Sequence, residues 1–222
     1  MSQFVLHSLD YYSSMQEHYQ KLSHLPGFVL LESADRPRAR YDIISAYPYD
    51  SIRIEYWTQD SHSLLSQLKQ MLLIQPSVVD LPFQGGAIGY ISYDFGEKLL
   101  GIDSLPQSTL TDMPLVDLGL YDWAIIVDHD LKKTTLFAAN THPSTTERVD
   151  EVLRLWKGTS REHREATLTS DFCALMAQDT YEQAFVQIHS ALTQGRCYQV
   201  NLTQPFQAQY DGDSWELYKR IS

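Results

Sequence analysis

The sequence predicts an α+β fold, on three observations. Short apolar runs alternate with helical patterns along most of the chain, and residues 51–58 show the two-residue alternation of a half-buried antiparallel strand. The charged segment 128–133 separates two apolar runs, as the connection of a β-hairpin does. The elements do not follow the regular strand–helix order of a doubly wound parallel sheet, so the α+β class is favoured.

The first elements are a helix, three strands and a second helix. Apolar residues recur at helical spacing from Tyr12 to Leu22, and Pro26-Gly27 ends this pattern. Three short strands are predicted next, at residues 28–31, 41–46 and 51–58. We expect Ser61 to cap the following helix. Its apolar face is formed by Leu64, Leu65, Leu68, Met71 and Leu72.

The middle of the chain is richer in predicted strands. They lie at residues 86–93, 115–120, 123–128 and 134–139. The run GGAIG at residues 85–89 lacks the Lys-Ser/Thr of a phosphate-binding loop and leads into a strand, so we interpret its glycines as serving a turn and close strand packing. Ser144 and Glu147 have the spacing of a capping box, which predicts a helix after them.

A polar segment divides the chain. Residues 158–170 have no hydrophobic period and predict a linker between a first region, residues 1–157, and a second region, residues 171–222. A strong helical pattern begins at Thr180 and ends at Gly195.

The last elements are a strand and a helix. Residues 197–210 alternate as one long strand, and Asp213 begins a helix that is unfinished at Ser222. We therefore expect the sequence to be a piece of a longer protein.

Composition excludes several classes of function. Seventeen Lys and Arg residues against 28 Asp and Glu residues give a net charge of −11, which disfavours a nucleic-acid or anionic-membrane surface. No apolar run approaches the roughly 20 residues that span a bilayer. Cys173 and Cys197 are too few for a disulfide framework, and the N-terminus has no export signal, so a cytoplasmic protein is expected.

Two stretches remain as candidate binding residues, since no histidine belongs to a metal-ligand pattern and no nucleophile elbow occurs. In the first stretch, a hydroxyl on Ser33 and guanidinium groups on Arg38 and Arg40 suit the charged groups of an amino acid, although spacing alone favours a solvated turn. In the second, polar residues alternate with apolar ones and line either a polar cavity or a wet sheet face. They are Gln199, Asn201 and Thr203.

Five segments match one known family in order. They are LSHLPGFVLLES (22–33), RYDII (40–44), LPFQGGAIGYISYD (81–94), LYDWAIIVDHD (120–130) and QGRCYQVNLTQPFQAQYDGDSWELY (194–218). In these segments the chain resembles the N-terminal half of the chorismate-utilising enzymes, most closely the branch of aminodeoxychorismate synthase component I.

The resemblance implies a fold and a division into domains. The fold is an incomplete antiparallel β-sandwich with flanking helices, like that of anthranilate synthase component I. Residues 1–157 are then the N-terminal region of that fold, and residues 171–222 are the start of a chorismate-binding catalytic domain.

The resemblance also implies an activity. Enzymes of this branch aminate chorismate at C4 to 4-amino-4-deoxychorismate, the precursor of 4-aminobenzoate and folate. The ammonia comes from a glutamine amidotransferase subunit (component II), and the reaction needs Mg²⁺ as a Lewis acid. The catalytic lysine, the assisting glutamate and the magnesium-binding glutamates of the branch have no counterpart in residues 1–222. We therefore expect no catalytic and no metal-binding residue in this chain, and no activity of the chain alone.

One ligand site of the family falls within the chain. The resemblance places Ser33 at a serine that meets the amino-acid group of a bound L-tryptophan. A second contacting stretch corresponds to Arg38, Ala39, Arg40 and Tyr41. Two other functions stay open: anthranilate synthase component I, whose amino group goes to another ring position, and a stand-alone tryptophan-binding module that has no catalytic half.

Overall fold

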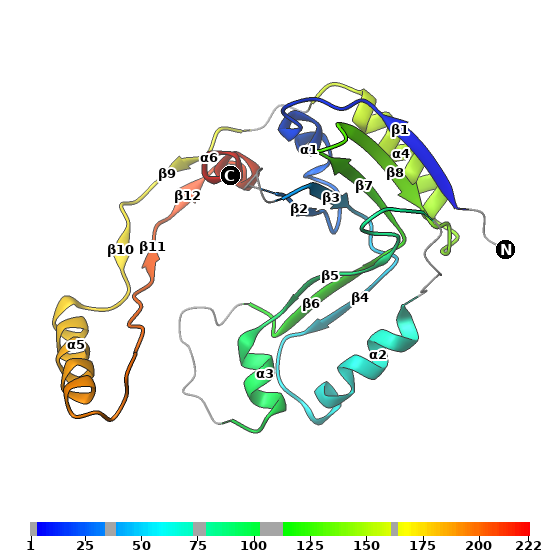
Figure 1. Ribbon diagram of the computed structural model, residues 1–222. Helices are drawn as coiled ribbons and strands as arrows, with labels where there is room; N and C mark the ends of the chain where they lie inside the picture. Colours follow the sequence, from blue (N-terminus) through cyan, green and yellow to red (C-terminus); the bar gives the residue numbers. More distant parts are fainter. Residues whose placement is uncertain (1–3, 34–38, 73–78, 103–112, 161–163) are drawn as a thin grey trace. The chain divides into compact units, whose positions relative to one another are not determined.

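The computed structural model describes residues 4–33, 39–72, 79–102, 113–160 and 164–222 (Figure 1). The chain divides into two compact units, Met1–Glu162 together with Ser222, and His163–Ile221. The boundary between them falls within residues 158–170, the segment predicted as a linker. Thr167 and Leu168, in the same segment, form a short strand of the second unit.

Two antiparallel sheets form the framework of the first unit. The larger has the order β1-β8-β7-β3-β2 and consists of β1 (Val5–Leu9), β8 (Lys133–Ala138), β7 (Trp123–Asp128), β3 (Tyr41–Ser45) and β2 (Val29–Leu31). The smaller has the order β4-β6-β5 and consists of β4 (Asp50–Ile54), β6 (Val116–Tyr121) and β5 (Gly86–Ile91). Only Asp122 separates β6 from β7, so the chain passes directly from one sheet to the other.

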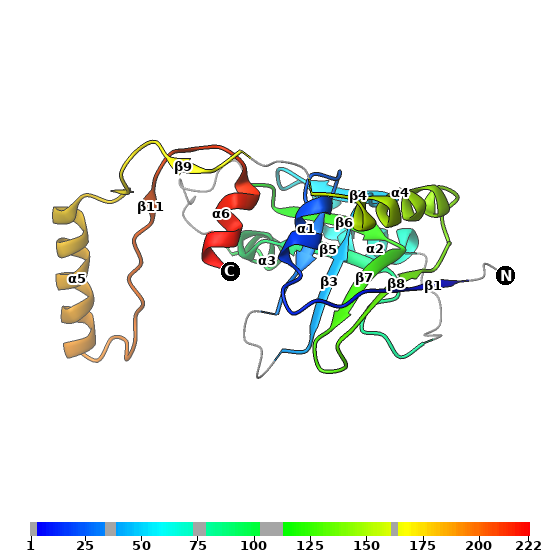
Figure 2. The ribbon, with the colours of Figure 1, turned by 90° about the horizontal axis from the view of Figure 1, so that it is seen from above.

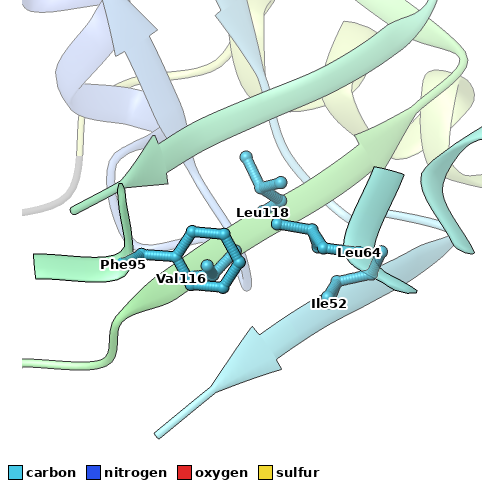
Figure 3. Packing of buried hydrophobic residues seen from close by; sticks show 5 residues of the cluster. All are labelled: Ile52, Leu64, Phe95, Val116 and Leu118. Carbon is cyan, nitrogen blue, oxygen red and sulfur yellow. The ribbon is translucent and has the colours of Figure 1, made fainter. Parts of the chain in front are cut away.

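Helices cover one face of each sheet. Figures 1 and 2 show α1 (Gln16–Leu22) beside α4 (Thr145–Lys157) on the five-stranded sheet. The short 3₁₀ helix Gln59–Ser63 precedes α2 (Leu64–Met71), which packs with α3 (Tyr93–Leu99) on the three-stranded sheet. The buried contacts there (Figure 3) are made by Ile52, Leu64, Phe95, Val116 and Leu118. The prediction of an α+β protein with antiparallel sheets and flanking helices is confirmed.

The second unit consists of two short ladders and two helices. The strand β9 (Thr167–Leu168) pairs with β12 (Tyr210–Asp211), and β10 (Cys173–Ala174) pairs with β11 (Phe206–Gln207). The helices are α5 (Gln178–Thr193) and α6 (Ser214–Ile221). Every residue of α5 is described and none is buried, so its apolar side chains have no core to pack into within this unit.

The long strand predicted over residues 197–210 is wrong for most of its length. Residues 197–205 form neither helix nor strand, and only Phe206–Gln207 and Tyr210–Asp211 are paired. A strand obtains its backbone hydrogen bonds from a neighbouring strand, and no described strand pairs with residues 197–205. The alternation of polar and apolar residues therefore showed which side chains lie on the same side of the segment, but it did not show whether another strand pairs with it.

Three local predictions also differ from the structure. Ser61 does not cap α2; it lies in the 3₁₀ helix, where its hydroxyl oxygen accepts the backbone N–H of Thr58 at 3.0 Å. Leu65, assigned to the apolar face of α2, is 64% exposed. The strand predicted over residues 86–93 ends at Ile91 instead, because Ser92 accepts the N–H of Phe95 at 3.1 Å and so caps α3.

Candidate functional site

Ser33 and Tyr41 lie together at one end of the β2–β3 ladder. Leu31 pairs with Ile43, and continuing this register brings Ser33 opposite Tyr41. The Ser33 hydroxyl donates a hydrogen bond to the carbonyl oxygen of Tyr41, and the Ser33 N–H donates to Oδ1 of Asp42 at 2.8 Å. Both the backbone and the side chain of Ser33 are therefore held by the neighbouring strand.

The bond to Tyr41 restricts what Ser33 can bind. A serine hydroxyl has one hydrogen to donate and two lone pairs that accept. Since the hydrogen is used on the Tyr41 carbonyl, the Ser33 oxygen can only accept from a further group. Ser33 thus suits a donor such as an ammonium group, and does not suit a carboxylate.

Arg40 is held by Asp128, the last residue of β7. Its Nε lies 3.0 Å from Oδ1 of Asp128, and its Nη2 lies 2.6 Å from Oδ2 of the same carboxylate. Hydrogen bonding between the two raises the pKa of Arg40 and lowers the pKa of Asp128. The guanidinium carbon also lies 4.7 Å from the centroid of the Tyr41 ring. Arg40 therefore links the ring of Tyr41 to Asp128 at the end of β7.

The other predicted site residues are placed less completely. Ala39 is half-buried directly before Arg40, whereas Arg38 lies outside the described residues. The structure thus brings Ser33 and Tyr41 into contact and places Arg40 against the ring of Tyr41.

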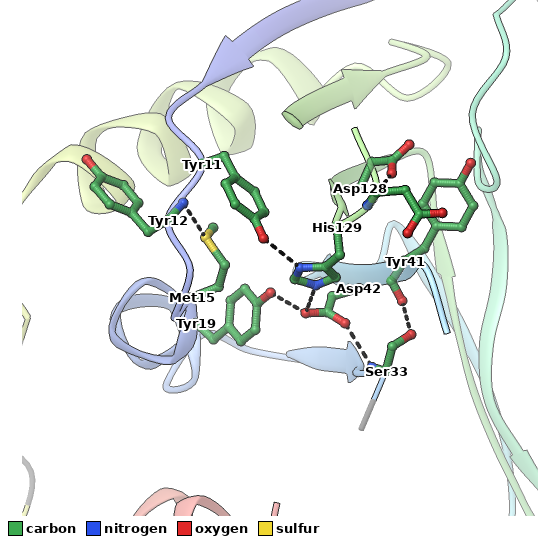
Figure 4. Close-up of polar contacts among 10 residues, drawn as sticks. Tyr11, Tyr12, Met15, Tyr19, Ser33, Tyr41, Asp42, Asp128 and His129 are labelled. Atoms are coloured by element: carbon green, nitrogen blue, oxygen red, sulfur yellow. Dashed lines mark hydrogen bonds and ion pairs between the residues drawn. The ribbon is translucent and has the colours of Figure 1, made fainter. Parts of the chain in front are cut away.

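A buried polar cluster lies immediately behind Ser33 (Figure 4). We call it the Asp42 cluster, and it consists of Asp42, Tyr19, His129 and Tyr11. The Asp42 carboxylate is fully buried, and its Oδ2 accepts the Tyr19 hydroxyl at 2.6 Å and lies 2.8 Å from Nε2 of His129. The other ring nitrogen of His129 lies 3.3 Å from the hydroxyl of Tyr11. Asp42 thereby connects β3 to α1 and to the β7–β8 connection.

Analysis of the sequence did not identify the Asp42 cluster. Part of the signal was present, because Asp42 is a charged residue within the apolar run that predicts β3. His129 lies 87 positions further along the chain, and no local spacing relates the two residues.

Elsewhere in the described part of the chain, few features suggest binding or catalysis. No group of three or more His, Cys, Asp or Glu residues is placed to hold a metal ion among the residues that the structure describes. Across the same residues, no helix has the length and apolar character needed to cross a membrane. A groove on the second unit is lined by α5, Arg196 and Val200, and the polar residues Gln199, Asn201 and Thr203 do not line it.

Comparison with known proteins identifies similar chains. Residues 27–222 match a family described as chorismate binding enzyme. The chain is 35% identical over 225 residues to aminodeoxychorismate synthase component 1 of Escherichia coli (strain K12), covering 92% of this chain and 47% of that protein. It is 26% identical over 203 residues to anthranilate synthase component 1 of Thermococcus kodakarensis, covering 86% of this chain and 43% of that protein.

The fold is also found among solved structures. The crystal structure of anthranilate synthase component I from Streptococcus pneumoniae TIGR4 superposes with a TM-score of 0.67 at 22% sequence identity. The match covers 87% of this chain and 46% of that chain. The chain therefore spans about half the length of the relatives that it matches.

Proposed function

Because the chain belongs to the chorismate binding enzyme family, we propose that it forms the N-terminal part of an aminodeoxychorismate synthase component 1. The observation that carries this proposal is the 35% identity to the Escherichia coli protein of that name over 92% of the chain. The whole enzyme then aminates chorismate at C4 to 4-amino-4-deoxychorismate, on the route to 4-aminobenzoate and folate. Its partner is a glutamine amidotransferase subunit that supplies ammonia.

Anthranilate synthase component I is the second candidate. The 26% identity to the Thermococcus kodakarensis protein favours it. Sequence identity is higher for the aminodeoxychorismate synthases, at 31–35% for three bacterial proteins, so we prefer the first candidate.

Product analysis separates the two candidates. The whole enzyme, of which we propose residues 1–222 to be the N-terminal part, is incubated with chorismate, ammonia and Mg²⁺, and the products are resolved by chromatography. We expect 4-amino-4-deoxychorismate as the product. Anthranilate as the main product would contradict the proposal and support the second candidate.

We propose that Mg²⁺ is the metal of the whole enzyme and that its ligands lie outside this chain. The described residues do not fit such a site, since no three acidic, His or Cys side chains converge among them. No step of the reaction is therefore assigned to a metal ion on these residues. A cytoplasmic location is part of the proposal, in keeping with the free cysteines Cys173 and Cys197.

We further propose that the Ser33 region binds L-tryptophan. The Ser33 oxygen, limited to accepting, is suited to the ammonium group of the amino acid. The remaining wall is assigned to Arg38, Ala39, Arg40 and Tyr41. Arg40 supports this wall and is not assigned to the ligand carboxylate, because Asp128 already holds its guanidinium group.

Ser33→Ala is expected to weaken L-tryptophan binding about tenfold. A hydrogen bond to a charged group contributes about 1.5–3 kcal/mol, and a factor of ten corresponds to about 1.4 kcal/mol. Affinity is measured by calorimetry on the protein expressed from its gene. Ser23→Ala is the matched control, because the Ser23 hydroxyl donates to the Gln20 carbonyl at the end of α1. Unchanged affinity in Ser33→Ala would remove Ser33 from the site.

A further inference from the structure

Asp42 is a charged residue in a place where packing alone does not require one. Its side chain is fully buried on β3, within the five-stranded sheet. A buried ion pair or polar network can often be replaced as a whole by apolar residues of similar volume without loss of stability. Cohesion between β3 and α1 therefore does not by itself explain a carboxylate at this position.

The contacts of this carboxylate point to a different task. Oδ1 accepts the backbone N–H of Ser33 at 2.8 Å, whereas Oδ2 contacts the side chains of Tyr19 and His129. A carboxylate oxygen only accepts, so the hydrogen between it and His129 is carried by Nε2 of the imidazole. One oxygen thus serves the backbone of the Ser33 region, and the other anchors the carboxylate to α1 and to the β7–β8 connection.

Ser33 lies beyond the end of its own strand, where the ladder no longer holds it. The strand β2 ends at Leu31, two residues before Ser33. Two bonds to the neighbouring strand hold Ser33 instead: its N–H donates to Asp42 and its hydroxyl donates to the Tyr41 carbonyl. Loss of the first bond would release the backbone that places the Ser33 oxygen.

We propose that Asp42 is the positioning residue of the Ser33 site. It fixes the backbone of Ser33 so that the oxygen of the hydroxyl, whose hydrogen is used on Tyr41, meets the ammonium group of the ligand. This inference rests on the proposed amino-acid site, and it assigns the selectivity of that site for a primary ammonium group to a buried carboxylate. A ligand that lacks the ammonium group does not use Ser33, and its affinity should not depend on Asp42.

The test compares Asp42→Asn with Tyr19→Phe in the whole enzyme. An asparagine has one acceptor oxygen, which we expect to face the two donors Tyr19 and His129. Its NH₂ group then faces the N–H of Ser33 and cannot accept from it. Tyr19→Phe removes a bond to the same carboxylate and leaves the bond to Ser33 in place. It therefore controls for a general effect of disturbing the Asp42 cluster.

Two readouts are measured for each protein. The first is amide hydrogen exchange at Ser33, followed by nuclear magnetic resonance without ligand. The second is the affinity for three probes: L-tryptophan, tryptamine, which keeps the ammonium group, and indole-3-propionate, which lacks it. In Asp42→Asn we expect at least tenfold faster exchange at Ser33 and about tenfold weaker binding of the two ammonium probes. Indole-3-propionate affinity should change less than twofold, and Tyr19→Phe should leave both readouts within twofold of the wild type.

Each other outcome has a distinct meaning. Equal weakening of all three probes in Asp42→Asn would give Asp42 a purely structural role and overturn the inference, as would unchanged exchange at Ser33. If the wild-type protein binds none of the probes, the proposed ligand site fails, and the positioning role fails with it. If Asp42→Asn does not fold, the wild-type protein still decides: a scalar coupling between the Ser33 amide nitrogen and the Asp42 carboxyl carbon supports the contact, and its absence overturns it.

Discussion

Residues 1–222 alone are expected to form no detectable 4-amino-4-deoxychorismate from chorismate, ammonia and Mg²⁺. The described residues include no group placed to hold the metal ion that the proposed reaction needs. The second unit, which we propose to be the start of the catalytic domain, also lacks packing partners for its apolar side chains among the described residues. No residue of α5 is buried, and residues 197–205 have no paired strand among those described. Such a surface cannot hold a substrate in a fixed, water-excluding pocket.

The assay uses the purified chain at high concentration, with chromatography to detect aminated product. Aminodeoxychorismate synthase component 1 of Escherichia coli, treated in parallel, shows that product would be detected. The part of the Escherichia coli protein that matches this chain is 47% of that protein, which is therefore about twice as long as this chain. Turnover by residues 1–222 that increases with their concentration would contradict the prediction, and would mean that the chain carries catalytic groups of its own.

Much of the first unit was predictable from the sequence, because its elements carry their signals locally. The apolar run 41–46 contains β3, and the polar segment 128–133 spans the connection from the end of β7 to the start of β8, which pair as a hairpin. Strands that are joined by short connections pack beside one another in the sheet. The hydrophobic periodicity of each strand therefore reflects the face that is buried in the folded protein. The helix α3 was missed because it has only seven residues and follows almost directly after β5, so that only the cap at Ser92 marks the change.

Residues 197–205 show where local signals fail. Their alternation is as regular as that of β4, yet they have no strand beside them in the described structure. The helix α5 was correctly predicted, but its apolar stripe, including Phe185 at 57% exposure, has nothing to pack against within its own unit. Hydrophobic periodicity predicts which side chains will be buried, but it does not predict which other element will bury them.

The candidate site was predictable only in part, for a similar reason. Ser33 and Tyr41 are eight positions apart, and the antiparallel pairing of β2 with β3 brings them together. The bond between Arg40 and Asp128 and the bond between Asp42 and His129 join residues that are 88 and 87 positions apart. Those pairs depend on β3 lying beside β7, a contact that no motif in the sequence specifies.

Gly89→Ala is expected to lower the free energy of unfolding by about 2–6 kcal/mol. Gly89 has a φ of +152°, which side chains other than hydrogen rarely allow. A Cβ atom there would lie 2.0 Å from the carbonyl oxygen of Asp117 and 2.9 Å from Cα of Leu118. Both obstacles are backbone atoms of the neighbouring strand β6, which is central in its sheet. Backbone strain contributes about 1–3 kcal/mol and overpacking about 1–3 kcal/mol more.

The effect should reach beyond residue 89. Relief of the contact requires β5 to move away from β6, which would loosen the pairs on either side, Ile88 with Gly119 and Tyr90 with Asp117. Unfolding is measured in urea, with Gly96→Ala as the control, because a Cβ atom at Gly96 in α3 meets nothing within 4 Å. Alanine in a helix is about 1 kcal/mol more favourable than glycine, so the control should be as stable as the wild type or slightly more so. Equal stability of the two variants would mean that β5 does not lie as close to β6 as the structure places it.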